Sequence, residues 1–225
     1  MILGSSDIKL ALGNEEVQKA FLGTTPVYKS SLFDAEVQYL QGTTATWIDT
    51  GIRDLLLDSE NWNLYIITDI GKGITVASSS IKGHGYYDSK ALFCGFSYQQ
   101  ARHIKINTTN KRYSTSGLVE VNITCINGKL NATVNGSSIW ANQTMASFTL
   151  PAFFLFAAAN DSGTKNPNSV LTTLRLQKCR FSVKGTNYFD YTAVRAGNVG
   201  YFYDDVSQQL IAPQAGAFTL GPDIT

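Results

Sequence analysis

Charged side chains are scarce in this chain of 225 residues, at 16% against about a quarter in an ordinary globular protein. The formal net charge is +1 and no basic run stands out. A nucleic-acid-binding surface therefore has no electrostatic support, and we expect no nucleic acid partner. The longest apolar run, Leu150 to Ala159, is too short to span a bilayer and contains Pro151, so we expect no membrane partner.

Metal-binding and nucleophilic residues are also few, with three cysteines and two histidines. The cysteines have no CxxC spacing, which argues against zinc, and their odd number argues against a disulfide framework: Cys94, Cys125 and Cys179. With only His84 and His103 present, no Ser-His-Asp set can be placed. Three carboxylates have the chemistry of calcium ligands, but a turn-capping or solvated role suits them better: Asp88, Asp204 and Asp205. We therefore predict no metal and no cofactor.

The opening residues, MILGSSDIKL, lack a basic stretch followed by an apolar one, so we expect no signal peptide and synthesis in a cytoplasm. Six N-x-S/T sequons are present. Without a signal peptide we interpret them as polar strand faces rather than glycosylation sites: Asn107, Asn122, Asn131, Asn135, Asn142 and Asn160.

The clearest local signal is the stretch from Leu118 to Trp140. Apolar and polar residues alternate from Val119 to Cys125 and again from Leu130 to Val134, which is the period of a strand with one buried face. Asn127-Gly128 between them is a strong two-residue hairpin signal, because both positions of a type I′ turn need φ > 0. This loop sets Cys125 opposite Leu130, Ile123 opposite Ala132 and Val121 opposite Val134. Asn135-Gly136 predicts a second turn, and the dry face of this meander needs a second sheet.

Further strands are predicted along the rest of the chain. In Asn61 to Ile70 the residues Trp62, Leu64, Ile66 and Thr68 share one face, and Ala91 to Tyr98 and Arg102 to Ile106 come next. Phe153 to Ala158 is nearly all apolar, so we expect it to be buried on both faces. Val170 to Val183 is expected to hold two strand pieces. No helix of normal length is predicted, so the class is all-β.

Residues 1–30 differ from the rest of the chain, because they contain short strand-like pieces but too few apolar residues for a core of their own. We expect a small N-terminal β-rich anchor segment over residues 1–30 and a main domain over residues 31–225.

Several motifs carry a family resemblance that covers residues 36–223. Tyr39-Leu40 followed by Trp47-Ile48-Asp49-Thr50-Gly51-Ile52 resembles the opening of concanavalin A-like, LamG-type domains in virion proteins of tailed phages. Later segments resemble that family's further motifs, with Ala193 where the family has proline: Leu155–Asn160, Asp190–Arg195, Val199–Asp204 and Gln209–Asp223. Residues 1–30 resemble a short N-terminal module of tail and other virion proteins. The resemblance implies a two-sheet antiparallel jelly roll, a concanavalin A-like sandwich.

The resemblance also implies a function at the virion surface. We expect a fibre or decoration subunit, attached to other virion proteins through residues 1–30 and self-associated as a trimer or, second, a dimer. The jelly roll is expected to be lectin-like and to adhere to cell-surface or mucosal glycans. A scaffold without glycan binding is the alternative, and a glycan-degrading enzyme is a third reading. The glucanase pattern E-x-D-x-x-E is missing among the five glutamates, and Asp58-x-Glu60 is the nearest approach, so we predict no enzyme activity.

Two stretches offer the aromatic and amide groups that a lectin-like site needs. One is the loop with His84, Tyr86, Tyr87 and Asp88 between glycines, for which turn packing or a subunit contact is the alternative. The other contains Trp140 and Asn142, with core packing as the alternative for the tryptophan. Trp47 and Trp62 are expected in the core.

Overall fold

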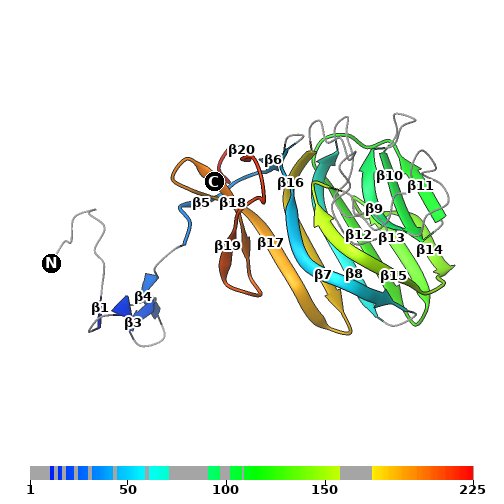
Figure 1. Ribbon diagram of the computed structural model, residues 1–225, viewed down its shortest axis with the longest axis horizontal. Coiled ribbons are helices and arrows are strands. Elements are labelled where there is room, and N and C mark those ends of the chain that lie inside the picture. The colour runs from blue at the N-terminus through cyan, green and yellow to red at the C-terminus, as the bar shows by residue number, and fades with distance from the viewer. Residues whose placement is uncertain are drawn as a thin grey trace. The chain divides into compact units, whose positions relative to one another are not determined.

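The computed structural model describes residues 11–12, 15–16, 19–22, 25–29, 32–42, 45–58, 61–70, 91–96, 102–107, 109–157 and 174–224. The chain forms two compact units, Met1–Leu32 and Phe33–Thr225. The described residues contain strands and no helix, and every described strand pair is antiparallel (Figure 1). The predicted all-β class with antiparallel sheets is confirmed.

The first unit holds two short hairpins, described here for the backbone. β1 (Ala11–Leu12) pairs with β2 (Glu15–Glu16), and β3 (Lys19–Leu22) pairs with β4 (Thr25–Lys29). The hairpins form two separate two-stranded sheets, in keeping with the β-rich character expected for residues 1–30.

An 11-stranded sheet dominates the second unit. Its main path runs β14-β13-β12-β8-β16-β17-β18-β19, and three short strands, β5, β6 and β20, join it beside β16 and β17. The strands are β5 (Ala35–Glu36), β6 (Leu40–Gln41), β8 (Trp62–Ile70), β12 (Val119–Ile126), β13 (Lys129–Val134), β14 (Ser137–Thr144), β16 (Leu174–Val183), β17 (Thr186–Ala196), β18 (Val199–Asp204), β19 (Gln209–Ile211) and β20 (Thr219–Leu220).

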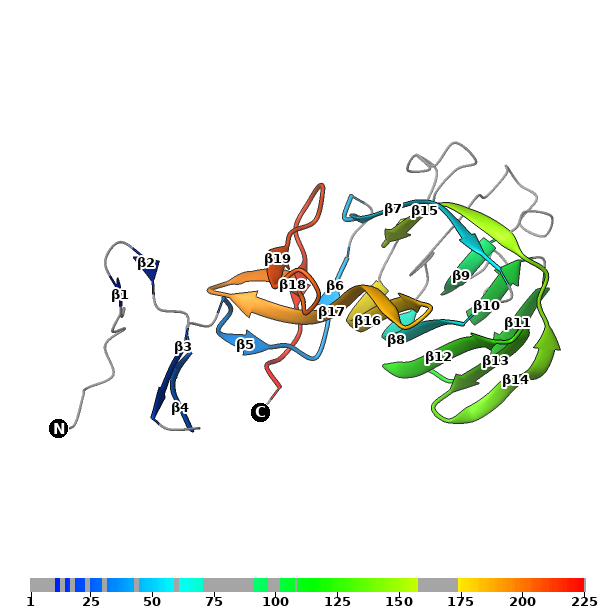
Figure 2. The same ribbon diagram turned by 90° about the horizontal axis from the view of Figure 1, so that it is seen from below.

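Two smaller sheets complete the unit. One pairs β7 (Ile48–Leu57) with β15 (Phe148–Leu155), and the other has the order β11 (Thr109–Tyr113), β10 (Arg102–Asn107) and β9 (Ala91–Phe96). Figure 2 shows β7 and β15 on one side and β8, β12 and β13 on the other, so the sheets form layers. Phe153 of β15 lies across this gap, with its ring centroid 5.3 Å from that of Phe181 and 5.4 Å from that of Phe189.

The hairpin predicted around Asn127-Gly128 is confirmed in every pair. Cys125 lies opposite Leu130, and the same register continues to Val121 opposite Val134. Asn127 and Gly128 have φ values of 50° and 72°, as a type I′ turn requires. The second predicted turn is also present, because Asn135 and Gly136 have φ values of 47° and 74°.

The core is built from the inward faces of these strands. Trp62, Leu64, Ile66 and Thr68 are each 2% exposed or less, which confirms that they share the buried face of β8. Cys125 is a buried free thiol, as expected, and burial raises its pKa. Burial of this apolar surface stabilises the fold by about 25 cal/mol for each Å² removed from water.

Residues 152–157, at the end of β15 and just after it, are all buried, which confirms the two-sided burial expected for the described part of the apolar run from Phe153. Phe153 and Leu155 belong to the main core, while Ala152 and Phe154 form a second buried cluster with Ala157. Trp47 is partly buried against that second cluster. The described part of Val170–Val183 is one strand, β16, rather than the two pieces expected. Its pairing with β8 shifts by one residue between Leu176 and Lys178, where the two pieces were expected to separate.

Candidate ligand-binding surface

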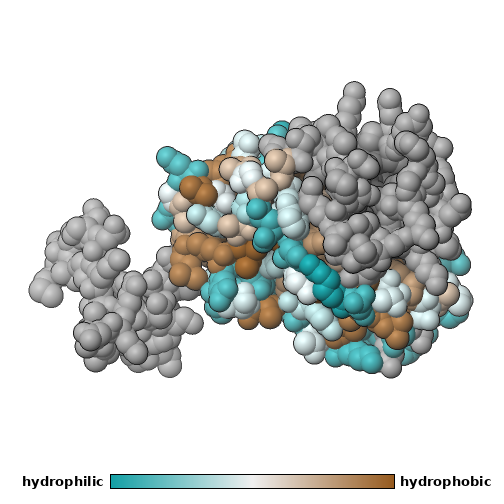
Figure 3. Space-filling view, viewed as in Figure 1, coloured by the Kyte–Doolittle hydropathy of each residue, from teal (hydrophilic) through white to brown (hydrophobic). Residues whose placement is uncertain are grey.

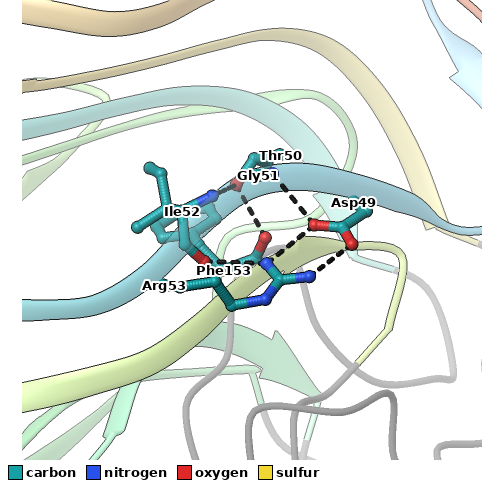
Figure 4. Close-up of polar contacts among 6 residues, drawn as sticks. All are labelled: Asp49, Thr50, Gly51, Ile52, Arg53 and Phe153. Carbon is teal, nitrogen blue, oxygen red and sulfur yellow. Dashed lines mark hydrogen bonds and ion pairs between the residues drawn. The ribbon is translucent and has the colours of Figure 1, made fainter.

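The segment Asp49–Arg53 in β7 forms a bulge (Figure 4). Asp49 lies opposite Phe154 and Arg53 lies opposite Ala152. The three residues of β7 between them therefore correspond to a single residue of β15, Phe153. Gly51 takes φ 77°, a left-handed conformation that glycine adopts without a steric penalty. Such bulges bend a strand and change where its side chains point.

Side chains of the bulge hold it in place through local bonds. The Thr50 hydroxyl donates to the Phe153 carbonyl across the strands at 2.7 Å, and the Gly51 N–H donates to Asp49 Oδ1 at 2.9 Å. Arg53 Nη1 donates to the same Oδ1 at 2.8 Å, and its Nη2 pairs with Oδ2. Burial alone raises the pKa of Asp49, but the hydrogen bonds from Arg53 and Gly51 hold it below its ordinary value. The side chains and backbone of the Asp-Thr-Gly motif therefore stabilise the bulge in β7.

The same arginine packs on the second buried cluster. The Arg53 guanidinium carbon lies 5.3 Å from the centroid of the Phe154 ring, and Trp47 meets that ring edge-on at 5.4 Å. The Arg53 guanidinium and the Asp49 carboxylate both contact neighbouring groups of the fold, which gives the two side chains a structural role in the bulge.

The glycan-binding residues predicted from sequence are not brought together on a described surface. The loop residues lie outside the described residues: His84, Tyr86, Tyr87 and Asp88. Trp140 is 4% exposed, so its ring lies in the core and offers no stacking face to a sugar. Within the described part of the chain, its indole N–H has no hydrogen-bond partner. Asn142 is exposed on the edge strand β14 with φ 52°, and its N–H donates to Asn131 Oδ1 at 3.0 Å.

The acidic candidates for metal binding or catalysis can now be placed. Asp204 is 5% exposed, and its carboxylate accepts hydrogen bonds from the N–H groups of Asp190, Val206 and Ser207 and from the Ser207 hydroxyl. This is the turn-capping role favoured for it. Among the residues that the structure describes, no group of three or more His, Cys, Asp or Glu side chains is placed to hold a metal. Asp88 and Glu60 lie outside the described residues.

Three sequon asparagines on β12–β14 use their amide oxygens within the sheet. Asn122 Oδ1 accepts from Asn63 Nδ2 at 2.7 Å, Asn131 Oδ1 accepts from the Asn142 N–H, and Asn135 Oδ1 accepts from the Glu120 N–H at 2.8 Å. Asn122 and Asn131 thus belong to polar strand faces, whereas Asn135 lies in the turn between β13 and β14.

The solvent side of the large sheet brings together polar residues from four strands. The register sets Asn122 of β12 opposite Tyr65 of β8, Tyr65 opposite Arg180 of β16, and Arg180 opposite Asp190 of β17. Their chain neighbours point into the core, so these four side chains point outward. We call Asn122, Tyr65, Arg180 and Asp190 the outer row.

Direct contacts join two members of the outer row to each other and connect the row to neighbouring side chains. The Tyr65 hydroxyl donates to Glu120 Oε2 at 3.1 Å, and the Arg180 guanidinium carbon lies 5.5 Å from the centroid of the Tyr65 ring. Burial, followed by the bond to Glu120, raises the pKa of Tyr65, so its hydroxyl stays a donor. Burial also raises the pKa of Asp190, although the positive charges of Lys178, 3.8 Å from Asp190 Oδ1, and of Arg180 act to lower it.

The outer row is accessible in the described part of the chain. All four of its side chains are partly exposed, and in Figure 2 no described strand lies on the outer side of β8 and β12. An aromatic ring with amide, guanidinium and carboxylate groups around it can bind a polar ligand with hydroxyl groups. Sequence reasoning missed this surface because its residues come from distant strands. The outward alternation of Asn63 and Tyr65 in β8 was the available signal.

Comparison with known proteins does not identify a family for this chain. A scan against protein-family models gave no match, and a search of curated proteins found no significantly similar sequence. The described part of the chain contains no helix with the length and apolar character needed to cross a bilayer.

Proposed function

We propose that this protein is a surface subunit of a tailed-phage particle, a fibre or decoration protein. Its Phe33–Thr225 unit is a concanavalin A-like jelly roll that adheres to cell-surface or mucosal glycans. The outer row is the observation that carries the proposal, because it presents a tyrosine ring among hydrogen-bonding groups on an accessible sheet face. A sugar ring stacks its C–H face on an aromatic ring while its hydroxyls bond to neighbouring amides and carboxylates.

The layered antiparallel architecture and the meeting of the opening and closing motifs support the jelly-roll part of the proposal. Leu40 of β6 pairs with Leu220 of β20, and Val37 forms a bridge with Asp223. The motifs at the two ends of the resembling region thus meet in one sheet.

A glycan array with the purified full-length chain tests the binding function. We expect binding to a subset of bacterial surface or mucosal glycans, and loss of that binding in Tyr65→Ala. Tyr188→Ala is the matched control, because Tyr188 is 44% exposed and lies outside the outer row. If no glycan binds to the wild-type protein, the scaffold alternative replaces the adhesin.

Attachment through residues 1–30 is the second part of the proposal. Short strands such as β3 and β4 gain stability by pairing with a partner surface. A variant that starts at Ser31 is expected to remain folded but to be missing from purified particles. Incorporation of that variant at the wild-type level would contradict the anchor role.

Self-association, as a trimer or a dimer, has a candidate contact surface at the end of the large sheet. In Figure 3 hydrophobic residues gather over β19, the last strand on the main path of that sheet. Leu210 and Ile211 are partly exposed there, and Val206 in the preceding turn is 45% exposed. A sheet edge with apolar side chains is stabilised by a further chain. Mass measurement of the full chain and of Leu210→Lys tests this, and an unchanged oligomer would place the contact elsewhere.

We also propose that the protein is not a hydrolase. Glu120 on the accessible face accepts a hydrogen bond from the Tyr65 hydroxyl. The residue opposite it on β8 is Ile67, so that position supplies no second carboxylate. Release of reducing sugar from bacterial capsule by the pure protein, abolished in Glu120→Gln, would contradict this.

A further inference from the structure

The outer face of β16 carries three cations whose partners differ. Arg175 pairs with Asp69 at 3.8 Å and donates to Gln41, and Lys178 pairs with Asp190 at 3.8 Å. Arg180 contacts the Tyr65 ring and has no carboxylate within ion-pair distance in the described part of the chain. Arg180 thus forms no direct ion pair with a described residue, although its charge acts on Asp190, which lies opposite it on β17.

Nearby carboxylates are already committed to other groups. Glu120 accepts from the Tyr65 hydroxyl, and Asp190 is paired with Lys178. Because the guanidinium lies over the Tyr65 ring, its orientation is restricted before any ligand arrives. A guanidinium presents its N–H groups as a planar fork that fits both oxygens of a carboxylate.

On this basis we infer that the outer row selects acidic glycans, with Arg180 binding the carboxylate of a uronic or sialic acid residue. The face of the Tyr65 ring that Arg180 leaves open stacks on the ring of the same sugar. The Asn122 amide nitrogen is available to a sugar hydroxyl, because the contacts of this side chain within the protein use its oxygen. The inference rests on the proposed glycan-binding function and names the class of ligand within it.

Binding to matched oligosaccharides tests the inference. The two probes differ only in one position, glucuronic acid in the first and glucose in the second. We expect the wild-type protein to bind the acidic probe roughly ten- to a hundredfold more tightly, the range given by a charge-assisted hydrogen-bonded pair. Arg180→Ala is expected to remove this preference while weak binding of the neutral probe remains. Because exposed charges are screened, the preference should shrink as salt is added.

The control variant is Lys129→Ala, which removes one positive charge from an exposed position on β13 away from the outer row. It is expected to keep the wild-type preference. Thermal unfolding and circular dichroism of each variant confirm that the fold is intact. Equal binding of both probes by wild-type protein, or an unchanged preference in Arg180→Ala, overturns the inference but leaves glycan binding standing. Absence of binding to either probe and to the wider array overturns both.

Discussion

Gly200 in β18 lies where the opening and closing segments of the main unit meet, and it is the sharpest test of that packing. A Cβ atom added there would lie 2.5 Å from Leu40 Cδ2, 3.0 Å from Leu220 Cδ2 and 3.2 Å from Phe218 Cβ. Gly200 has no positive φ, so alanine introduces no backbone strain at this position. The effect of Gly200→Ala therefore reports on side-chain crowding alone.

The size of the effect can be worked out from these distances. Carbon atoms in contact lie about 3.5–4.0 Å apart, so the end of the Leu40 side chain has to move by roughly 1 Å. Leu40 is fully buried, and overpacking of such sites costs about 1–3 kcal/mol. Since the nearest atom is the end of a flexible side chain, we expect about 2 kcal/mol. For a domain of about 150–250 residues this lowers the unfolding temperature by roughly 4–8 °C.

A double-mutant cycle followed by urea unfolding isolates the contact. Leu40→Ala alone is expected to cost about 2–5 kcal/mol by leaving a cavity. In the double variant the new methyl group fills part of that cavity, so its loss of stability should be smaller than the sum by about 1 kcal/mol or more. Gly136→Ala is the control. Its φ is 74° with no atom within 4 Å of the added Cβ, so it should destabilise by about 1 kcal/mol through the backbone without coupling to Leu40. Additive costs for Gly200 and Leu40 would refute the reasoning.

Three further predictions concern groups in the same unit. Asp204→Ala should lower the free energy of unfolding by roughly 2–3 kcal/mol, because it removes the acceptor for four donors, whereas a chelator should leave the wild-type midpoint unchanged. The pKa of Asp49 is depressed in the fold, so its stabilisation is complete above the unfolded value and is lost as pH falls through the folded one. Urea titrations between about pH 5 and pH 2 should show this loss, and Asp49→Asn should reduce it; an equal loss in that variant contradicts the assignment. Phe153→Ala should cost about 3–5 kcal/mol in urea unfolding, and a cost below 1 kcal/mol would place this ring outside the core.

The features predicted correctly from sequence are those set by near neighbours. The Asn127-Gly128 hairpin depends on two backbone conformations and on alternation within six residues of the turn, and both are visible in the chain. The burial of residues 152–157 on both faces was predictable for the same reason, because this continuous apolar run has no polar face. The similar turn at Lys184-Gly185, with φ values of 52° and 79°, was missed because lysine is not a typical residue for a left-handed position.

Trp140 shows how a bulge defeats an argument from alternation. Ser137 lies opposite the core-facing Val134, so strict alternation directs Ser137 and Ile139 inward and Trp140 outward. A register shift between Ala132 and Thr133 breaks that order and places Trp140 opposite Ala132, on the core side. One extra residue in a strand reverses the faces of the residues that follow it until a second shift, here between Leu130 and Ala132, restores the order. No local residue type in β14 indicates either shift.

The outer row depends on strand order, which is a property of the whole sheet. Tyr65 and Glu120 are 55 positions apart in the chain, and β16 lies between β8 and β17 although long segments separate β8 from β16 in sequence. Each strand shows its own outward residues by alternation. Their alignment into one row is fixed only when β8 pairs with both β12 and β16.

The motif that is easiest to recognise and the surface that is proposed to bind ligand are therefore different parts of the protein. Asp49, Thr50 and Gly51 form bonds within the β7 bulge, so the fold itself constrains these residue types. Tyr65 and Arg180 point away from the core, and other strand-compatible residues at these positions would leave the packing of β8 and β16 intact. A chain can thus keep the opening motif and the sheet while its outer row changes. The ligand has to be inferred from the outward side chains of β8, β12, β16 and β17, because the motif reports on the fold.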